Sequence, residues 1–255
     1  MEPNAQNAIS ILAEVQESCG REFLAYWVLP NAILTMCGVR AFCDGVFWSD
    51  NKKVLVKWSK EITYSLEVIK SHSSLLTIET NINKVRKNET YASYDLIFGD
   101  GLNYVISQSG LLGVDRLDLS NTKLTFEDIQ KQIYRILCSR TQYKKYSKEN
   151  IYHMVFGVLL GYPDGAIVES VKLWEDNDPF AEKLIDADIH GAGYYRCPQP
   201  IYNYPRHLIN DPEINSHEKM WSKLLSDYYH SDFHKELEKN PKFQAKMKEL
   251  GNLNY

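Results

Sequence analysis

The residues best spaced for chemistry lie in one short segment, residues 190–197, which reads His-Gly-Ala-Gly-Tyr-Tyr-Arg-Cys. Small residues there let the backbone approach a ligand, and polar and aromatic residues stand beside them. The His190 imidazole can titrate near neutral pH, and the Arg196 guanidinium can hold an anion. A histidine beside Cys197 would favour its nucleophilic thiolate. The segment therefore predicts catalytic residues at His190 and Cys197, and a glycine-rich turn without a ligand is the alternative.

The five cysteines include no Cys-x-x-Cys pair, so neither a zinc ribbon nor a thioredoxin-type motif is predicted. Free thiols in a reducing compartment are the simplest interpretation. Cys19 is a further candidate nucleophile, because a helix that restarts there would lower the pKa of its thiol, with His190 as the base. The alternative is a core position, since Cys19 continues an apolar stripe with Leu12 and Phe23. The same core interpretation applies to three others: Cys37, Cys43 and Cys138.

Metal and cofactor motifs are not predicted. His230 and His234 have the four-residue spacing that places two imidazoles on one helical face. Ser231, however, is a typical N-cap, which would leave His230 outside the helix and remove the shared face. The chain has no Gly-x-x-x-x-Gly-Lys loop, no Gly-x-Gly-x-x-Gly turn and no Gly-x-Ser-x-Gly elbow. We therefore expect neither a metal nor a cofactor.

Aromatic residues are abundant, with 17 tyrosines in 255 residues. Tyrosine and tryptophan are favoured at protein–protein contacts, because a large apolar ring carries a polar tip. Four tyrosines cluster in the proline-rich stretch 186–212, which is long for a loop of a folded domain. A tyrosine-rich core is the alternative. The predicted binding residues are Tyr194, Tyr195, Arg196, Tyr202 and Tyr204.

The charge balance gives no support for nucleic acid as a partner, because 33 acids and 29 bases leave a net charge of −4. Residues 23–39 carry no charge, but Pro30 interrupts them and a membrane-spanning helix needs about 20 apolar residues. The first ten residues lack the basic and apolar regions of a secretory signal. We expect a soluble cytoplasmic protein without a membrane span, and export as an effector stays open.

The apolar pattern predicts helices in the first 42 residues, on either side of Pro30. The next third is rich in short β-branched runs, which are typical of strands. Gly99, Asp100 and Gly101 predict a hairpin turn between two of them. The expected strands are residues 54–58, 62–69, 75–80, 94–98 and 103–107.

From Thr125 onward the pattern is helical. Thr125 and Ser147 are predicted N-caps, and Gly161 followed by Tyr162 and Pro163 predicts a break between two helices. Further helices are expected near residues 218–229 and 232–239. The predicted fold class is α+β, with an N-terminal helix pair, a mainly antiparallel sheet of four or five strands and a helical C-terminal half. We expect one structural unit over 1–255, with a sheet-containing part at about 1–120 and a helical part at about 121–255.

Two functions fit these observations. The first is a non-catalytic protein-binding or regulatory protein, such as a bacterial accessory or effector protein, which predicts an exposed aromatic patch and another protein as the partner. The alternative is a cysteine-dependent hydrolase or transferase. It predicts a thiol within hydrogen-bond reach of a histidine, as Cys197–His190 or Cys19–His190.

Overall fold

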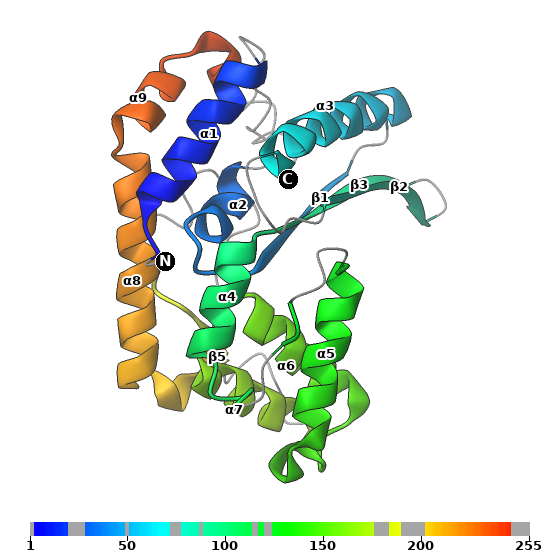
Figure 1. The fold of residues 1–255 in the computed structure, drawn as a ribbon, viewed down its shortest axis with the longest axis vertical. Coiled ribbons are helices and arrows are strands. Elements are labelled where there is room, and N and C mark those ends of the chain that lie inside the picture. The colour runs from blue at the N-terminus through cyan, green and yellow to red at the C-terminus, as the bar shows by residue number, and fades with distance from the viewer. Residues whose placement is uncertain are drawn as a thin grey trace.

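The first and the last helices that the structure describes pack together into one layer. The computed structural model describes residues 3–19, 29–48, 51–71, 78–86, 89–113, 117–119, 124–175, 184–189 and 202–245. Helices α1 (Ala5–Cys19) and α2 (Leu29–Met36) lie beside α8 (Pro212–Tyr229), and α9 (Asp232–Glu238) continues from α8 (Figure 1). Leu12, Ile33 and Trp221 are fully buried between them. This layer buries the apolar faces of the first helices, as their pattern requires.

A second group of helices forms the lower part of the molecule in Figure 1. It comprises α4 (Gly99–Gln108), α5 (Phe126–Ser139), α6 (Lys148–Leu159) and α7 (Asp164–Glu175). Both predicted N-caps are confirmed: Thr125 and Asp128 form a reciprocal capping box on α5, and the Ser147 side chain accepts a hydrogen bond from the Asn150 N–H on α6. The short helix η2 (Thr141–Tyr143) joins α5 to α6. Ile133, Met154 and other apolar residues form a core of their own.

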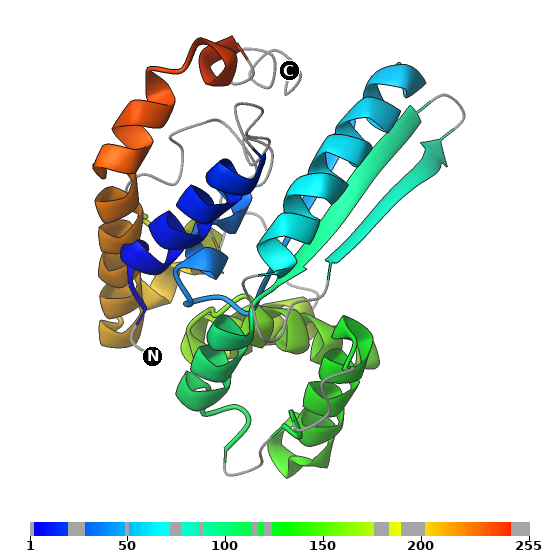
Figure 2. The same ribbon diagram turned by 45° about the horizontal axis from the view of Figure 1, so that its top comes forward.

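The main sheet has three antiparallel strands in the order β1-β3-β2. These are β1 (Phe42–Trp48), β2 (Ile78–Arg86) and β3 (Glu89–Ile97), and α3 (Lys52–Lys70) packs along β2 and β3 (Figure 2). A separate two-stranded ladder pairs β4 (Leu184–Asp186) with β5 (Asn203–Pro205), just before the short helix η4 (Arg206–Leu208). β5 lies against α7 and brings the chain back to the lower group.

The predicted fold class with a sheet of four or five strands is wrong, because the chain is helix-rich. Residues 54–58 and 62–69 were expected to be strands, and both lie in the single helix α3. The side chain of Asn51 caps this helix, and Leu66 and Ile69 are buried at a helical spacing. The alternation of Ile62 and Tyr64 with polar residues therefore belongs to an amphipathic helix.

The predicted hairpin at Gly99–Gly101 is also wrong, since these residues form the first turn of α4 and 103–107 continues it. Leu102 and Val105 are buried three residues apart, which fits the period of a helix. Gly101 serves close packing: a Cβ atom there would overlap the carbonyl oxygen of Arg40. The strand expected at 94–98 is confirmed within β3, and the part of 75–80 that the structure describes lies in β2.

The two hydrophobic cores meet at a narrow junction. The Ala41 N–H donates to the Leu159 carbonyl at 2.8 Å, and the Phe98 N–H donates to the Ala41 carbonyl at 3.0 Å. The side chains of Tyr104 and Tyr162 pack against both cores. Within the described ranges, no helix is both long enough and apolar enough to cross a membrane.

Candidate functional site

The first predicted active site falls outside the described residues. This holds for His190, Tyr194, Tyr195, Arg196 and Cys197. Cys19 is the last residue of α1, and its side chain also lies outside the described part. The cysteine–histidine pairing therefore stays a prediction.

Tyr202 and Tyr204, two of the predicted binding residues, lie inside the protein with exposed fractions of 1% and 3%. The Tyr202 ring is 5.1 Å from the Tyr162 ring and 5.8 Å from the Trp221 ring. The Tyr204 hydroxyl donates a hydrogen bond to the Glu218 carboxylate at 3.1 Å. Both positions fit the tyrosine-rich core that was the alternative, and direct contact with a protein partner at them stays a prediction.

Two of the predicted core cysteines are confirmed as core. Cys37 and Cys43 each have an exposed fraction of 1%. Burial and the nearby Asp227 carboxylate raise the pKa of the Cys37 thiol to about 12. Since the thiolate is the nucleophile, Cys37 is unreactive at neutral pH.

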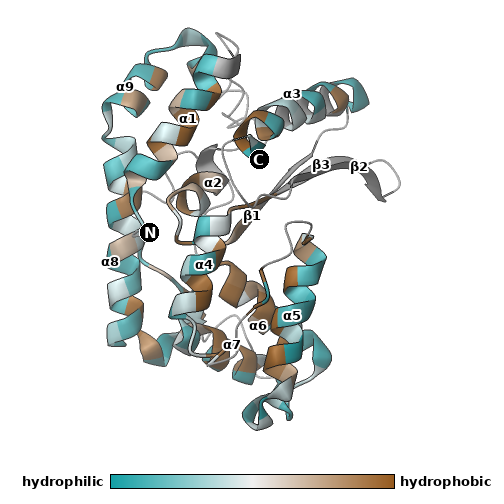
Figure 3. Cartoon of the chain, in the orientation of Figure 1, coloured by the Kyte–Doolittle hydropathy of each residue, from teal (hydrophilic) through white to brown (hydrophobic). Residues whose placement is uncertain are grey.

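Helix α6 exposes rings where a helix of this kind normally exposes charges. Its inner face buries Ile151, Met154, Val155 and Val158 in the lower core. Its outer face carries Tyr152, His153 and Phe156, and the exposed fractions of Tyr152 and Phe156 are 45% and 38%. Figure 3 shows that hydrophobic residues cover most of α6. A helix that is apolar on more than its core-facing stripe has a second surface to cover.

Neighbouring rings extend this surface across α5. The Tyr134 and Tyr152 rings stack with centroids 4.6 Å apart, and the Phe126 ring lies 6.5 Å from the Phe156 ring. We call these five residues, which are all exposed or partly buried, the aromatic face: Phe126, Tyr134, Tyr152, His153 and Phe156. This face is the kind of exposed aromatic patch that the protein-binding hypothesis predicts. The sequence pattern did not predict these five residues as a surface, because rings on a helix fit buried core positions equally well.

A pocket of about 240 Å³ opens beside the aromatic face, between α6, α7 and the start of β5. We call it the aromatic pocket. His153 and Phe156 belong to both the face and the pocket, and the His153 ring lies 4.5 Å from the Trp174 ring. Gly157 lets the two helices approach closely, since a Cβ atom there would come within 2.7 Å of Ile167. The walls are thus mainly ring and aliphatic surfaces.

Two residues in the walls of the aromatic pocket, Ser170 and Tyr202, have hydroxyl groups that are enclosed by protein. The Ser170 and Tyr202 side chains are 7% and 1% exposed. Neither the Ser170 Oγ nor the Tyr202 hydroxyl has a hydrogen-bond partner among the described residues. A buried hydroxyl without a partner costs about 1–3 kcal/mol of stability. Since both oxygens are enclosed, they belong to the interior of the pocket walls and do not face the space of the pocket.

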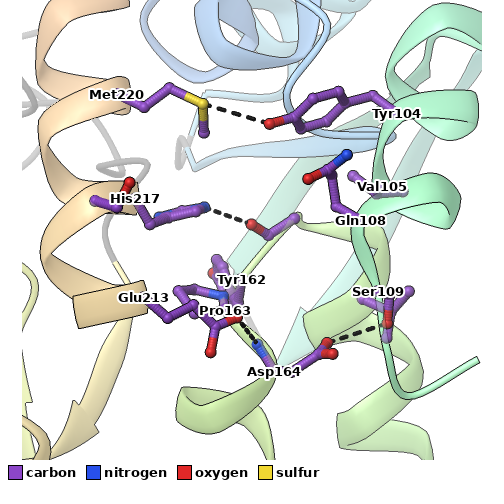
Figure 4. Close-up of a pocket in the computed structure, with 13 residues that line it drawn as sticks. Tyr104, Val105, Gln108, Ser109, Tyr162, Pro163, Asp164, Glu213, His217 and Met220 are labelled. Carbon is purple, nitrogen blue, oxygen red and sulfur yellow. Dashed lines mark hydrogen bonds between the residues drawn. The ribbon is translucent and has the colours of Figure 1, made fainter. Parts of the chain in front are cut away.

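A second pocket, of about 260 Å³, lies on the other side of Tyr162, between α4, α8 and the turn at Gly161 (Figure 4). The Asp164 carboxylate accepts hydrogen bonds from the Ser109 hydroxyl and from the N–H groups of Gly110 and Leu111. Burial raises the pKa of Asp164 in spite of these bonds. The Glu213 carboxylate accepts a hydrogen bond from the Asp164 N–H at 3.2 Å, at the N-terminus of α7.

His217 completes this second pocket. Its Nε2 lies 2.7 Å from the Gly161 carbonyl oxygen, so Nε2 is the protonated nitrogen and donates the bond. Burial, with a smaller effect from the Arg40 charge, lowers the pKa of His217 to about 4. The imidazole is therefore neutral at pH 7. Asp164, Glu213 and His217 are all engaged in holding neighbouring elements, which makes this pocket the weaker candidate for a site.

Metal binding finds no support in the described ranges, where no three His, Cys, Asp or Glu side chains converge. The His230 ring contacts the Ser226 carbonyl of its own helix end. Ser231 caps α9 as the sequence predicts, and His234 lies inside this helix and is buried. Comparison with protein-family models, with curated proteins and with solved structures finds no match to this chain.

Proposed function

We propose that this chain is a protein-binding module, which contacts its partner through the aromatic face and holds one apolar side chain of the partner in the aromatic pocket. The observation that carries the proposal is the outward row of Tyr152, His153 and Phe156 on α6, next to a pocket lined by the last two. Interfaces gain most of their binding energy from a few aromatic anchors that fill pockets.

The size of the aromatic pocket supports a side chain as its occupant. Sites for cofactors and drug-sized molecules enclose roughly 300–1,000 Å³. At about 240 Å³ this pocket is smaller than that range. A single large side chain therefore fits it better than a cofactor does.

The charges beside the aromatic face indicate an acidic partner segment. Lys144, Lys145 and Lys148 are exposed in the connection and first turn that lead into α6. Glu149 and the Glu175 carboxylate, which accepts a hydrogen bond from the Ser147 N–H, offset part of this charge. Lys148 precedes Tyr152 by one helical turn. Acidic residues flanking an apolar anchor would complement this edge of the face.

The compartment belongs to the same proposal. Cys37 and Cys138 are free thiols in the part of the chain that the structure describes. This supports a module that works in a reducing compartment, such as the cytoplasm of a bacterium or of a cell that receives an effector.

A displayed peptide library tests the proposal. We expect the wild-type protein to enrich peptides with one large apolar residue between acidic ones. Fluorescence anisotropy should then show affinity for an enriched peptide falling about tenfold or more in Tyr152→Ser and Phe156→Ser variants, as for residues at the centre of an interface. Tyr64→Ser, at a 51% exposed tyrosine on α3, is the matched control and should bind normally.

Circular dichroism establishes that each variant is folded before its affinity is compared. If no peptide is enriched, or if the enriched peptides bind the Tyr152 and Phe156 variants as tightly as the wild type, the aromatic face is not the binding surface.

A further inference from the structure

We infer that the partner segment is an α-helix that runs in the same direction as α6 and places an acidic N-terminal turn over the cationic end of the aromatic face. The cationic end consists of four exposed residues: Arg135, Lys144, Lys145 and Lys148. The inference rests on the proposed function and names the form and the direction of the partner. Its basis is the charge at this end and the row of side chains that leads from it to the aromatic pocket.

The cationic end has more positive charge than its surroundings neutralise. The sequence from Ile129 to Lys148 contains six basic residues and no acidic one. Of these, Lys131 pairs with Glu127 of its own helix at 2.5 Å. The four residues of the cationic end form no salt bridge within the described ranges. Glu149 and Glu175 offset only part of their charge, so this end attracts acidic groups.

Helix α6 presents charge and rings in one row. Lys148, Tyr152 and Phe156 follow one another at four-residue spacing, so they form a ridge on one side of the helix. At a rise of about 1.5 Å per residue, this ridge is roughly 12 Å long. Phe156 borders the aromatic pocket. In a helical partner, the apolar anchor and the acidic residues would therefore lie about two turns apart.

The backbone beneath the aromatic face favours a helical partner. The face is built on α5 and α6, whose interior N–H and C=O groups bond within each helix. An extended segment laid on the rings would bury backbone groups that find no partner there, whereas a helix satisfies these groups internally. The stacked rings of Tyr134 and Tyr152 join α5 and α6 into one surface against which a third helix can pack.

The charges set the direction of this helix. Acidic residues stabilise the first turn of a helix, and basic residues stabilise the last turn. Acidic residues over the cationic end are therefore most favourable in the partner's N-terminal turn. At the opposite end of the face, Glu127 and Asp128 follow Phe126 in the first turn of α5, and Lys131 offsets Glu127. That end suits the basic last turn of the same helix, so the partner is expected to run in the direction of α6.

Two display libraries test the form of the partner. One randomises the outward positions of a stable single helix, and the other randomises as many positions on a disulfide-closed β-hairpin. We expect the wild-type protein to enrich helices with aspartate or glutamate concentrated in the first turn and a large apolar residue about two turns later. Exchange of the charges between the two ends of the best helix, with its anchor kept in place, should weaken binding about tenfold in fluorescence anisotropy.

A matched pair of variants tests the direction. Lys144→Glu/Lys148→Glu should abolish the preference for the original helix over the end-exchanged one, because it reverses charges of the cationic end. Lys219→Glu/Lys223→Glu changes the net charge equally at exposed lysines of α8 and should keep the preference. If the first variant fails to fold, ionic strength decides instead: added salt should weaken the original helix and reduce the preference.

Each contrary result has a distinct meaning. Equal binding of the two helices, or equal effects of the two lysine pairs, would overturn the inference. Hairpins that bind through Tyr152 and Phe156, with no helix enriched, would overturn it and leave the protein-binding proposal standing. No binder from either library would overturn both. Sedimentation velocity of the protein alone examines a second copy as the occupant: a dimer that Tyr152→Ser and Phe156→Ser abolish would also overturn the inference, and a monomer supports a separate partner.

Discussion

His217 shows how one buried side chain couples the fold to pH. It joins α8 to the turn after α6 through its bond to the Gly161 carbonyl, and its ring lies 4.5 Å from the Trp221 ring. Arg40 packs over the same indole, 5.7 Å from its centroid. Burial is the main reason that the pKa of the imidazole is lowered, and a proton on His217 would also place a second positive charge in this cluster.

Substitution of His217 should change the pH dependence of stability. Its pKa of about 4 in the folded protein lies below the ordinary value of 6.5, so the unfolded chain takes up the proton first as the pH falls. Stability from this group is therefore complete above pH 6.5 and is lost as the pH falls toward 4, by at most about 3 kcal/mol. Urea unfolding at pH 7 and pH 4.5 should show a smaller loss for His217→Gln, whose amide can still donate to Gly161.

The matched control is His207→Gln, because the His207 side chain is 62% exposed. His234 also has a lowered pKa, but it is present in both variants and cancels in the comparison. Asp164 has a raised pKa, so its protonation favours the fold and acts in the opposite direction in all forms compared. Equal pH slopes for the wild type and His217→Gln would show that His217 does not control acid stability.

Among the elements, the turn after α6 has the most demanding geometry. Gly161 has φ +70°, and the N–H groups of Gly161 and Tyr162 donate to the carbonyls of Val158 and Gly157. This is a Schellman motif, which ends a helix with a residue in the left-handed conformation. Asp164 then begins α7, so the turn aims Tyr162 between the two pockets.

Gly161→Ala should destabilise the protein by about 2–4 kcal/mol, which combines the cost of a left-handed alanine with that of overpacking. The new methyl group would overlap the Val39 carbonyl oxygen. Gly165→Ala is the control, since a Cβ atom there meets only the Glu213 carboxylate at 3.6 Å, an ordinary contact. Urea denaturation measures both variants, and equal stabilities would contradict the role assigned to Gly161.

The elements that the sequence predicts correctly are those with local signals. The caps at Thr125 and Ser147 and the break at Gly161 depend on residues close in sequence, and all three are confirmed. The error at α3 has a different origin. The β-branched residues Val54 and Ile62 favour strands weakly, and burial of Leu66 and Ile69 by distant elements determines that the segment is helical.

For the molecule as a whole, the candidate site depends on contacts that no local pattern reveals. Phe156 and Ser170 lie on successive helices, but Tyr202 reaches the aromatic pocket from beyond residues 184–186 of β4, after a long connection. The tyrosine-rich stretch predicted Tyr202 as a binding residue, and its burial fits the core alternative. Its position in a buried wall, and the exposure of the α6 rings, follow only from the tertiary arrangement of α5, α6, α7 and β5.

The two hydrophobic cores should unfold together, as the prediction of one structural unit over 1–255 requires. Tyr104 and Tyr162 both pack against the two cores. Hydrogen exchange measured by mass spectrometry across a urea series should give one midpoint for peptides from α1 and α8 and for peptides from α5 and α6. Two midpoints in the wild type would show two separate units.

Tyr162→Ala should lower stability by about 3 kcal/mol and bring the two midpoints apart, because it removes one of the two tyrosines that pack against both cores. Tyr64→Ala, at an exposed position outside both cores, should leave the midpoints together. The order of unfolding is also informative. If the α5–α6 peptides of Tyr162→Ala lose protection first, the aromatic face belongs to the less stable group, and a bound partner peptide should raise that midpoint selectively.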